Sequence, residues 1–314
     1  MLPSQLPGDF LKRISELLSP QELSAWIVSA SCPPLAVRWT GDPTSAAQGA
    51  AALAAAGLDA TPVPWCAQAW SLGCIPRSRV SRLPLVSAQQ LFLQSLSSMA
   101  AVMALDVRPG HDVLDLCAAP GGKTSLIRRQ QQGRGMLVAN ELSRARTVRM
   151  KKVLARLNIE GVEVLTGPGA SMGSTHERCF DRVLADVPCS GEGRFHLSDA
   201  ATWSRWSLAG IRGLAKRQAT LLESACKTLR PGGVAVYATC TMAPEENERV
   251  VDRVVRRGRI PLEILPVDLQ LTSTKPGLHR WQGRSMLPEM ARTVRVLGDT
   301  ETTPFYIARL RRTG

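Results

Sequence analysis

Apolar positions alternate between two patterns along the second half of the chain. Short continuous apolar runs, typical of buried strands, are separated by stretches in which apolar residues return every three or four positions. The runs are HDVLDLC (111–117), GMLVANE (135–141), GVEVLTG (161–167), FDRVLADV (180–187) and GGVAVYATC (232–240). The helical stretches are 123–131, 143–157, 208–229 and 244–257. Strands that alternate with helices predict an α/β fold with a parallel, doubly wound sheet.

Two details refine this pattern near the end of the chain. The helix at 244 begins with Pro244, Glu245 and Glu246, which suit the first turn of a helix. The segment PFYIARLRR (304–312) predicts a late strand at or near the edge of the sheet.

The first eighty residues follow a different pattern. A helix is predicted over 6–18, a second over 20–30, and an Ala-rich helix that ends at Gly57. The segment TPVPWCAQAW is extended and interrupted by proline. We therefore expect two domains, a small α+β module at residues 1–80 and the α/β domain at 81–314. The apolar stripe of the first helix consists of Leu6, Phe10, Ile14, Leu17 and Leu18.

The charge of the chain points to a polyanionic partner. Lys and Arg total 39 against 26 Asp and Glu, giving a formal net charge of +13 and a pI near 10.0. Nucleic acid is the first partner that such a balance indicates, and a merely solubilising surface is the alternative. Aromatic residues are only 4% of the chain, so extensive base stacking is not expected.

Composition also indicates the cellular compartment of the protein and the state of its cysteines. No run reaches 18 apolar residues and no basic segment precedes an apolar core at the N-terminus, so we expect neither membrane nor secretion. The eight cysteines contain no Cys-x-x-Cys pair, which argues against a zinc site or a disulfide framework. We expect no metal, reduced thiols and a cytoplasmic protein.

The first predicted strand leads into a loop suited to a nucleotide. In VLDLCAAPGGKT, Gly121 and Gly122 allow close approach of a ligand to backbone at a helix N-terminus. The loop matches neither the Gly-x-Gly-x-x-Gly fingerprint nor the phosphate loop of nucleoside triphosphatases. Glu141 closes the second strand, 24 residues after Cys117, where a carboxylate can accept both hydroxyls of a ribose. The alternative is a tight strand-to-helix turn without a ligand.

Two cysteines follow the ends of neighbouring strands. Cys189 lies in DVPCSGEG after the fourth strand, and Cys240 lies in YATCT at the end of the fifth. Thiols at strand ends beside a nucleotide loop suit nucleophilic catalysis. Asp186 is an acid held in an extended turn by Pro188. For the other cysteines a core position is the simpler interpretation: Cys32, Cys66, Cys74, Cys117, Cys179 and Cys226.

One reaction uses a thiol, an acid and a methyl donor together. Addition of a thiolate to carbon-6 of cytosine makes carbon-5 nucleophilic enough to attack an electrophilic methyl group. An acid at N3 stabilises the adduct, and a second thiol can assist its breakdown. The residues alone do not decide which of the two thiols attacks.

Five motifs in order resemble the RNA (cytosine-5)-methyltransferases of the NOL1/NOP2/Sun family: LDLCAAPGGKT, ANELSRAR, DVPCSGEG, YATCT and PEENERVV. The similarity runs from about residue 94 to 312. LPGDFLKRI and TPVPWC further resemble the bacterial branch that methylates 16S ribosomal RNA, methyltransferase F. The resemblance implies a Rossmann-like domain that uses S-adenosylmethionine, with RNA as its partner.

The family assigns roles residue by residue. It implies Cys240 as the nucleophile, Cys189 as the thiol that assists product release, and Asp186 and Lys123 as further catalytic residues. Its cofactor site corresponds to the following residues: Cys117, Ala118, Ala119, Pro120, Gly121, Gly122, Lys123, Glu141, Arg146, Gly169, Asp186 and Pro188.

The sequence departs from the family in three places. Gly169 stands near the position of an acid that contacts the adenine side of the cofactor. LAVRWT only approximates an Arg-Val-Asn signature, and TTPFYIAR replaces Asp-Gly-Phe-Phe. The chain ends soon after this last strand, and we expect no C-terminal RNA-binding extension of the kind this branch carries. Either the N-terminal module and a basic face suffice to bind RNA, or the choice of target differs.

Several alternatives stay open. The target is ribosomal RNA, as the branch implies, or transfer RNA. A catalytically weak RNA-binding or ribosome assembly factor on the same fold is a second possibility, because the acid at Gly169 is missing. A DNA methyltransferase is a third, although the Thr-Cys-Thr and Pro-Glu-Glu-Asn pattern speaks against it. The family suggests a monomer.

Overall fold

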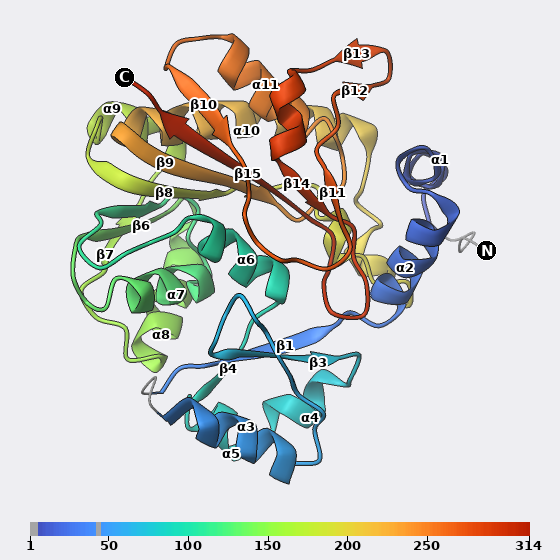
Figure 1. Cartoon of the computed structure of the whole chain (residues 1–314), viewed down its shortest axis with the longest axis vertical. Helices are drawn as coiled ribbons and strands as arrows, with labels where there is room; N and C mark the ends of the chain where they lie inside the picture. The colour runs from blue at the N-terminus through green and yellow to red at the C-terminus, as the bar shows by residue number, and fades with distance from the viewer. Residues whose placement is uncertain (1–5, 42–44) are drawn as a thin grey trace.

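A nine-stranded central sheet organises the protein. The computed structural model describes residues 6–41 and 45–314 (Figure 1). The strand order is β11-β14-β15-β9-β8-β5-β6-β7, and β10 also pairs with β15. The strands are β5 (Val113–Asp115), β6 (Leu137–Glu141), β7 (Glu163–Thr166), β8 (Phe180–Asp186), β9 (Leu229–Thr239), β10 (Leu262–Leu265), β11 (Thr274–Pro276), β14 (Val294–Val296) and β15 (Phe305–Arg312).

The five strands predicted from apolar runs form the parallel part of this sheet. Strands β9, β8, β5, β6 and β7 are parallel neighbours, as expected. Their carboxyl ends therefore meet at one edge, where Asp115 pairs with Leu184 and Asp186 pairs with Ala238. Ligands of such sheets bind outside these ends, so this edge positions the site.

The last predicted strand, β15, lies near an edge of the sheet but not at it. Strand β15 runs antiparallel to β9 and is covered on its other side by β14 and β10. Its covering strands have only three or four residues, too few to show a periodic pattern in the sequence.

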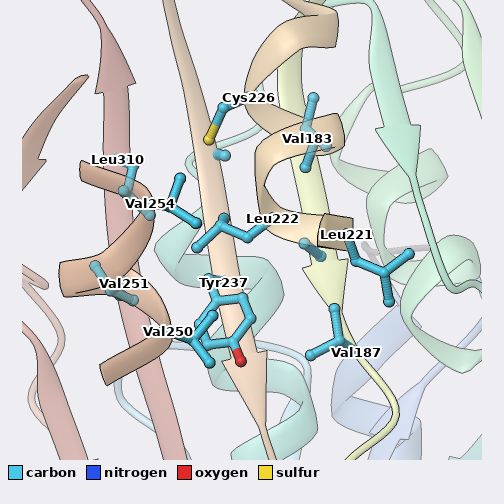
Figure 2. Packing of buried hydrophobic residues seen from close by; sticks show 14 of the residues in the cluster. Val183, Val187, Leu221, Leu222, Cys226, Tyr237, Val250, Val251, Val254 and Leu310 are labelled. Carbon is cyan, nitrogen blue, oxygen red and sulfur yellow. The ribbon is translucent and has the colours of Figure 1, made fainter. Parts of the chain in front are cut away.

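Helices cover both faces of the central sheet, as a doubly wound sheet requires. One face packs Leu184, Val236 and Ala238 against α6 and α7. The other packs Val183, Ala185 and Tyr237 against α10 and α11, as Figure 2 shows for part of the cluster. Neighbouring residues of one strand thus serve opposite faces. The helices are α6 (Leu96–Ala104), α7 (Gly122–Gln130), α8 (Arg144–Arg156), α9 (Met172–Thr175), α10 (Leu208–Thr228) and α11 (Glu248–Arg256), with short 3₁₀ turns at Gly169–Ser171, Glu192–Arg194, Ala200–Thr202 and Pro288–Arg292.

Helix α11 begins four residues later than predicted. Residues 244–247 form a turn, and Asn247 has backbone angles outside the helical region. Glu245 and Glu246 therefore do not serve the first turn of a helix. Their carboxylates bind side chains and backbone of other elements instead, which outweighs their local preference for a helix start.

A second sheet lies beside the central one, and we call it the small sheet. Its order is β2-β3-β1-β4, all antiparallel. Because β4 comes from residues 91–93, the small sheet takes its last strand from beyond residue 80, and a domain boundary at 80 stays a prediction. The elements are β1 (Leu35–Trp39), β2 (Thr61–Pro62), β3 (Ala69–Gly73), β4 (Leu91–Leu93), α3 (Ala46–Ala55), α4 (Arg77–Ser81) and α5 (Pro84–Ser87).

The first two helices stand apart from the small sheet. Helix α1 (Gly8–Leu17) and helix α2 (Pro20–Ser31) lie beside β11 and β14 (Figure 1). The predicted apolar stripe of the first helix packs on Phe195, Met242 and Leu297, which lie near the central sheet. A hairpin of β12 (Arg280–Trp281) and β13 (Arg284–Ser285) lies near α11.

One expectation about cysteines is wrong. Cys32 and Cys74 form a disulfide, with Cα atoms 5.5 Å apart, so they are neither reduced nor simple core thiols. The bond joins the end of α2 to the segment after β3, 42 residues along the chain, and a spacing of that length carries no signal in the sequence. Cys66 and Cys226 are buried free thiols, as expected.

Membrane-spanning helices and clusters of metal ligands are both absent from the described parts of the chain. Within residues 6–41 and 45–314 no helix is long and apolar enough to cross a membrane. In the same segments no group of three or more His, Cys, Asp or Glu side chains is arranged to hold a metal ion.

Candidate active site

The two strand-end cysteines meet. Because β8 and β9 are parallel neighbours, the loops that follow them leave the same edge of the sheet. The Sγ atoms of Cys189 and Cys240 lie 3.3 Å apart, and both residues are free thiols. The backbone holds this arrangement, since Gly193 N–H donates to the Cys240 carbonyl at 2.9 Å. A Cβ at Gly193 would lie 2.1 Å from the Pro304 carbonyl oxygen, so only glycine fits this close approach.

The surroundings of the two thiols differ. A hydrogen bond from the Cys189 thiol, together with the nearby Arg194 guanidinium, lowers the pKa of Cys240. The same contact, burial and the Glu246 carboxylate raise the pKa of Cys189. A lowered pKa favours the thiolate, which is the nucleophilic form of a cysteine.

Asp186 and Lys123 form an ion pair beside these cysteines. Lys123 Nζ lies 2.7 Å from Asp186 Oδ2, and both side chains are largely shielded from solvent. Burial works against the ammonium charge, but the Asp186 carboxylate outweighs it and raises the pKa of Lys123. The pair joins the first turn of α7 to the end of β8, so it connects two of the predicted motifs.

The predicted nucleotide loop lines a cavity of about 220 Å³. Gly121 has a φ of +103°, and a Cβ there would lie 3.1 Å from Met150. A Cβ at Gly122 would lie 3.2 Å from the Phe92 ring. The two glycines thus allow the loop to pack closely against Met150 and Phe92 while it forms one side of the cavity. The predicted residues that line the cavity are Cys117, Ala118, Ala119, Pro120, Gly122, Lys123 and Asp186.

Glu141 presents a buried acceptor near this loop. Its Oε1 accepts from the Ser143 N–H at 2.9 Å and from the Arg146 guanidinium at 3.3 Å. Its Oε2 makes no hydrogen bond in the described structure, although Arg146 lies 3.3 Å away. Arg146 also donates to the Ala119 carbonyl at 2.8 Å, which ties the loop to Glu141. A buried carboxylate oxygen without a donor indicates that a ligand supplies one.

Asp115 is a further residue of this cavity, and the sequence motifs predict no role for it. It ends β5, lines the cavity and accepts from the Thr124 hydroxyl at 2.7 Å, while Oδ1 has no hydrogen bond among the described residues. Burial raises the pKa of Asp115 to about 7. Its signal in the sequence was a charged residue closing a fully apolar strand.

One wall of the cavity comes from a segment that no motif marked. Phe92, Gln94, Ser95 and Ser98 line it from β4 and the start of α6. Arg38 Nε donates to Gln94 Oε1 at 2.7 Å, and its guanidinium lies 5.1 Å over the Phe92 ring. With Gln94 Oε1 engaged by Arg38, the Gln94 amide nitrogen is left as a buried donor without a partner in the described structure.

Five predicted cofactor residues do not line the cavity: Gly121, Glu141, Arg146, Gly169 and Pro188. Gly121 belongs to the loop, and Glu141 and Arg146 are tied to it, whereas Gly169 and Pro188 have other contacts. Gly169 packs against Leu116 and Leu221, and its carbonyl accepts from the Ser224 hydroxyl at 2.7 Å. The carbonyl of Pro188 accepts from Gln218 Nε2 at 2.9 Å. The assignment of Gly169 and Pro188 to a cofactor stays a prediction.

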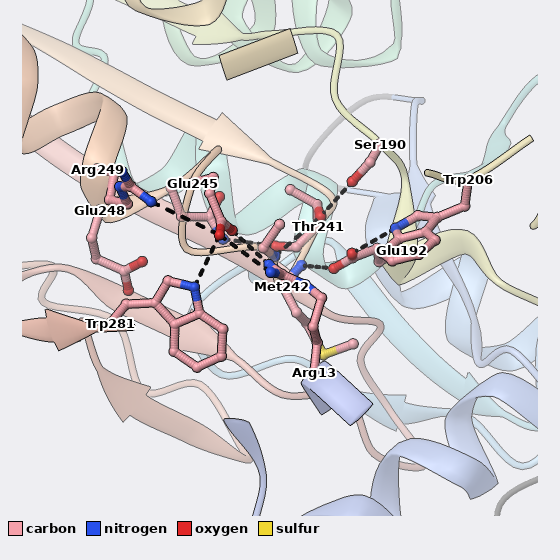
Figure 3. Close-up of polar contacts among 12 residues, drawn as sticks. Arg13, Ser190, Glu192, Trp206, Thr241, Met242, Glu245, Glu248, Arg249 and Trp281 are labelled. Carbon is pink, nitrogen blue, oxygen red and sulfur yellow. Dashed lines mark hydrogen bonds and ion pairs between the residues drawn. The ribbon is translucent and has the colours of Figure 1, made fainter. Parts of the chain in front are cut away.

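Buried carboxylates fix the loops that carry the thiols. Glu246 Oε2 accepts from the Ser190 N–H at 2.9 Å and from Gln218 at 2.7 Å, and burial raises the pKa of Glu246 to about 7. Glu192 accepts from Trp206 at 2.8 Å and from the Met242 N–H at 3.0 Å. Figure 3 shows the Glu192 contacts together with the hydrogen bond between Ser190 and Thr241.

The arrangement combines three capacities at one edge of the sheet. It offers a thiol with a lowered pKa, a carboxylate paired with a lysine, and a cavity with unsatisfied donors and acceptors. Such a site can form a covalent bond to a planar electrophile while a second molecule lies in the cavity.

A family model and curated relatives match the chain. The model described as 16S rRNA methyltransferase RsmB/F matches residues 102–311. The tRNA (cytosine(49)-C(5))-methyltransferase of Pyrococcus abyssi is 37% identical over 222 residues, covering 70% of this chain and 69% of that protein. Ribosomal RNA small subunit methyltransferase F of Escherichia coli O6:H1 is 32% identical over 317 residues, covering 98% of this chain and 63% of that protein.

The chain spans only part of some relatives. It covers 52% of the methyltransferase F of Enterobacter sp. (strain 638), at 34% identity over 81% of its own length. Among solved structures, a methyltransferase homolog protein from Pyrococcus horikoshii superposes with a TM-score of 0.78 at 28% identity, covering 99% of this chain and 100% of that one. NSun6 from the same organism shares the fold, with a TM-score of 0.81 at 19% identity and 98% coverage of both chains.

Proposed function

Because the chain belongs to the family of 16S rRNA methyltransferases RsmB/F, a branch of the NOL1/NOP2/Sun family, we propose that it methylates carbon-5 of a cytosine in RNA. The reaction passes through a covalent bond between Cys240 and the base. The observation that carries this proposal is the contact between two free thiols beside an Asp–Lys pair.

S-Adenosylmethionine is the proposed methyl donor, and the residues of the cavity fit it. The free Oε2 of Glu141 suits a ribose hydroxyl, and the loop from Cys117 to Lys123 brings backbone close to a ligand. The unpartnered amide nitrogen of Gln94 offers a donor inside the same cavity. Bound there, the cofactor supplies an electrophilic methyl group.

Cys240 performs the covalent step. Its thiolate adds to carbon-6 of the cytosine, and the electron pair of the 5,6 double bond becomes available at carbon-5, which takes up the methyl group. The lowered pKa of Cys240 increases the fraction of thiolate near neutral pH. The target base must leave its stack to expose carbon-6 to the sulfur.

Asp186 and Lys123 act on the ring of the base. Asp186 acts as the acid: its protonated carboxyl donates a hydrogen bond to N3 and stabilises the negative charge that develops there when the thiolate adds. Lys123, whose Nζ lies 2.7 Å from Asp186 Oδ2, holds this group in place and supplies a positive charge beside the reacting groups.

Cys189 assists the final step. After methylation a base takes the proton from carbon-5, the double bond re-forms and the bond between carbon-6 and Cys240 breaks. The Cys189 thiol, whose pKa is raised, stays protonated and donates a hydrogen bond to the departing Cys240 sulfur. That hydrogen bond makes the thiolate a better leaving group.

The direct test uses purified protein, labelled S-adenosylmethionine and a set of RNAs. We expect label in 5-methylcytosine with the native chain and none with Cys240→Ala. Absence of methyl transfer with measurable cofactor binding would leave the RNA-binding or assembly factor as the better assignment. Labelled transfer to DNA and not RNA would support the DNA methyltransferase.

Ribosomal RNA is the proposed target, and transfer RNA is the second candidate because the Pyrococcus abyssi relative is a tRNA methyltransferase. Bisulfite sequencing of total RNA with and without the gene decides between them. We further propose that the protein is a monomer that acts on RNA in the cytoplasm, not at a membrane.

A further inference from the structure

A groove of about 1000 Å³ lies outside the site described above. Helices α10 and α11 form its floor, while α1 and the β12–β13 hairpin contribute its rims. Figure 1 shows these four elements on the same side of the molecule, away from the small sheet.

The groove is strongly basic. Two carboxylates, Glu245 and Asp252, face eight basic side chains across it. Both carboxylates are already engaged, Glu245 by Arg13 at 2.6 Å and Asp252 by Arg256 at 2.8 Å. The basic residues that line the groove are Arg13, Arg212, Lys216, Arg249, Arg253, Arg256, Arg257 and Arg284.

Four of these cations have no partner among the described residues. The side chains of Arg212, Lys216, Arg253 and Arg284 are exposed and take part in none of the ion pairs or side-chain hydrogen bonds of the described residues. They come from α10, α11 and the hairpin, so three separate elements place unpaired positive charge around one groove.

The spacing within each helix increases the local charge. Arg212 and Lys216 lie four residues apart on α10, as do Arg249 and Arg253 on α11. Like charges at this spacing repel on a helix surface. An anion in the groove would relieve that repulsion, because the two helices face it together.

The groove is connected to the loop of Cys189 through the turn before α11. The groove residue Glu245 accepts from Trp281 Nε1 at 3.0 Å and from Arg13 (Figure 3). The next residue, Glu246, accepts from the N–H of Ser190, which follows Cys189. The turn at residues 244–247 thus links a wall of the groove to the cysteine site, and we infer that the strand next to a base in that site would pass over this turn.

We propose that this groove binds the phosphate backbone of the RNA strand that flanks the target cytosine. The inference rests on the proposed RNA substrate. Arginine forks favour phosphate oxygens, and the basic row on α11 from Arg249 to Arg256 spans about 10 Å. Phosphate contacts fix the position of the strand and carry no base preference.

The test compares two triple variants that remove equal charge. The groove variant is Arg212→Gln, Lys216→Gln and Arg253→Gln. The matched control is Arg149→Gln, Lys151→Gln and Lys152→Gln on α8, where three exposed cations also have no partner in the described structure. Fluorescence anisotropy with a labelled substrate RNA is measured over a range of salt concentrations, and cofactor affinity confirms that each variant is folded.

The groove variant should weaken RNA binding at least about tenfold and reduce the slope of log K against log salt by about 2. The α8 variant should change neither beyond about twofold. Equal effects of both variants, or an unchanged salt slope in the groove variant, would overturn the proposal that the groove binds the RNA backbone. If the native protein binds RNA through the groove but transfers no methyl group, the proposed methyltransferase activity is wrong, whereas the assignment of the groove as an RNA-binding site is supported.

Discussion

The sulfur atoms of Cys189 and Cys240 lie 3.3 Å apart, although 51 residues separate them in the chain. Parallel pairing of β8 with β9 aligns Asp186 with Ala238 and so delivers both loops to one place. At this distance the two thiols interact directly, so they titrate as a pair.

Substitution of Cys240 should remove the covalent step. Cys240→Ala should lower methyl transfer at least about 10³-fold, because no other residue replaces an activated nucleophile. Denaturing gel electrophoresis should show no RNA adduct. Cofactor affinity serves as the control, and a variant that retains near-native turnover would disprove the assignment of Cys240.

Substitution of Cys189 should have a different outcome. Cys189→Ala retains the attacking thiol but loses the hydrogen bond that stabilises the departing sulfur. We expect protein to accumulate on RNA as a band resistant to denaturation. Free release of methylated RNA by this variant would refute the release role.

The buried carboxyl of Glu246 should make stability depend on pH. Its pKa is raised from 4.5 to about 7, so its favourable contribution is complete below about pH 4.5 and is lost as the pH rises through 7. Glu246→Gln keeps an acceptor for Ser190 and Gln218 but does not titrate. Relative to the native protein, its unfolding free energy should rise by roughly 2–3 kcal/mol between pH 4.5 and about 8.

Urea unfolding at several pH values measures this difference. Glu289→Gln is the matched control, since Glu289 is exposed. If the difference in unfolding free energy between Glu246→Gln and the native protein does not change with pH, the carboxyl is not held protonated.

Glu141 should determine affinity for the methyl donor. Glu141→Gln removes the charge from the buried acceptor and should weaken S-adenosylmethionine binding by about 10- to 100-fold, the usual value of a hydrogen bond to a charged group. Isothermal titration calorimetry measures it. Glu163→Gln, at an exposed position on β7, should bind like the native protein.

Arg38 should affect the cofactor cavity without lining it. In Arg38→Met, Gln94 Oε1 loses its hydrogen bond and the Phe92 ring loses the cation that lies over it. Because Gln94 and Phe92 line the cavity, we expect cofactor affinity to fall about tenfold. Arg38→Lys should not restore it, because an ammonium cannot make the same set of planar contacts. Native affinity in a stably folded Arg38→Met would contradict this role.

The catalytic edge could be predicted from sequence because its residues follow strand ends. Glu141 closes a buried apolar run, Cys189 and Cys240 follow two others, and parallel strands bring their carboxyl ends together. The order of the motifs along the chain was therefore enough to expect a common site, and the structure brings the two thiols into contact.

The remaining site residues could not be predicted, for physical reasons. Arg38 and Gln94 are 56 residues apart and meet only because β1 pairs with β4. Glu246 has a good local preference for a helix start, and tertiary hydrogen bonds override it. Short strands such as β14 carry too few residues for periodicity, so the sequence did not predict the strands that lie beyond β15.

Arg38 also connects two parts of the molecule that differ in architecture. From β1 of the small sheet it donates to Gln94 and to the Gly122 carbonyl at the start of α7, which both border the cavity. One buried guanidinium thus holds two walls of the cavity and a strand of the other sheet in a fixed relation, so a displacement of β1 would carry both contacts with it.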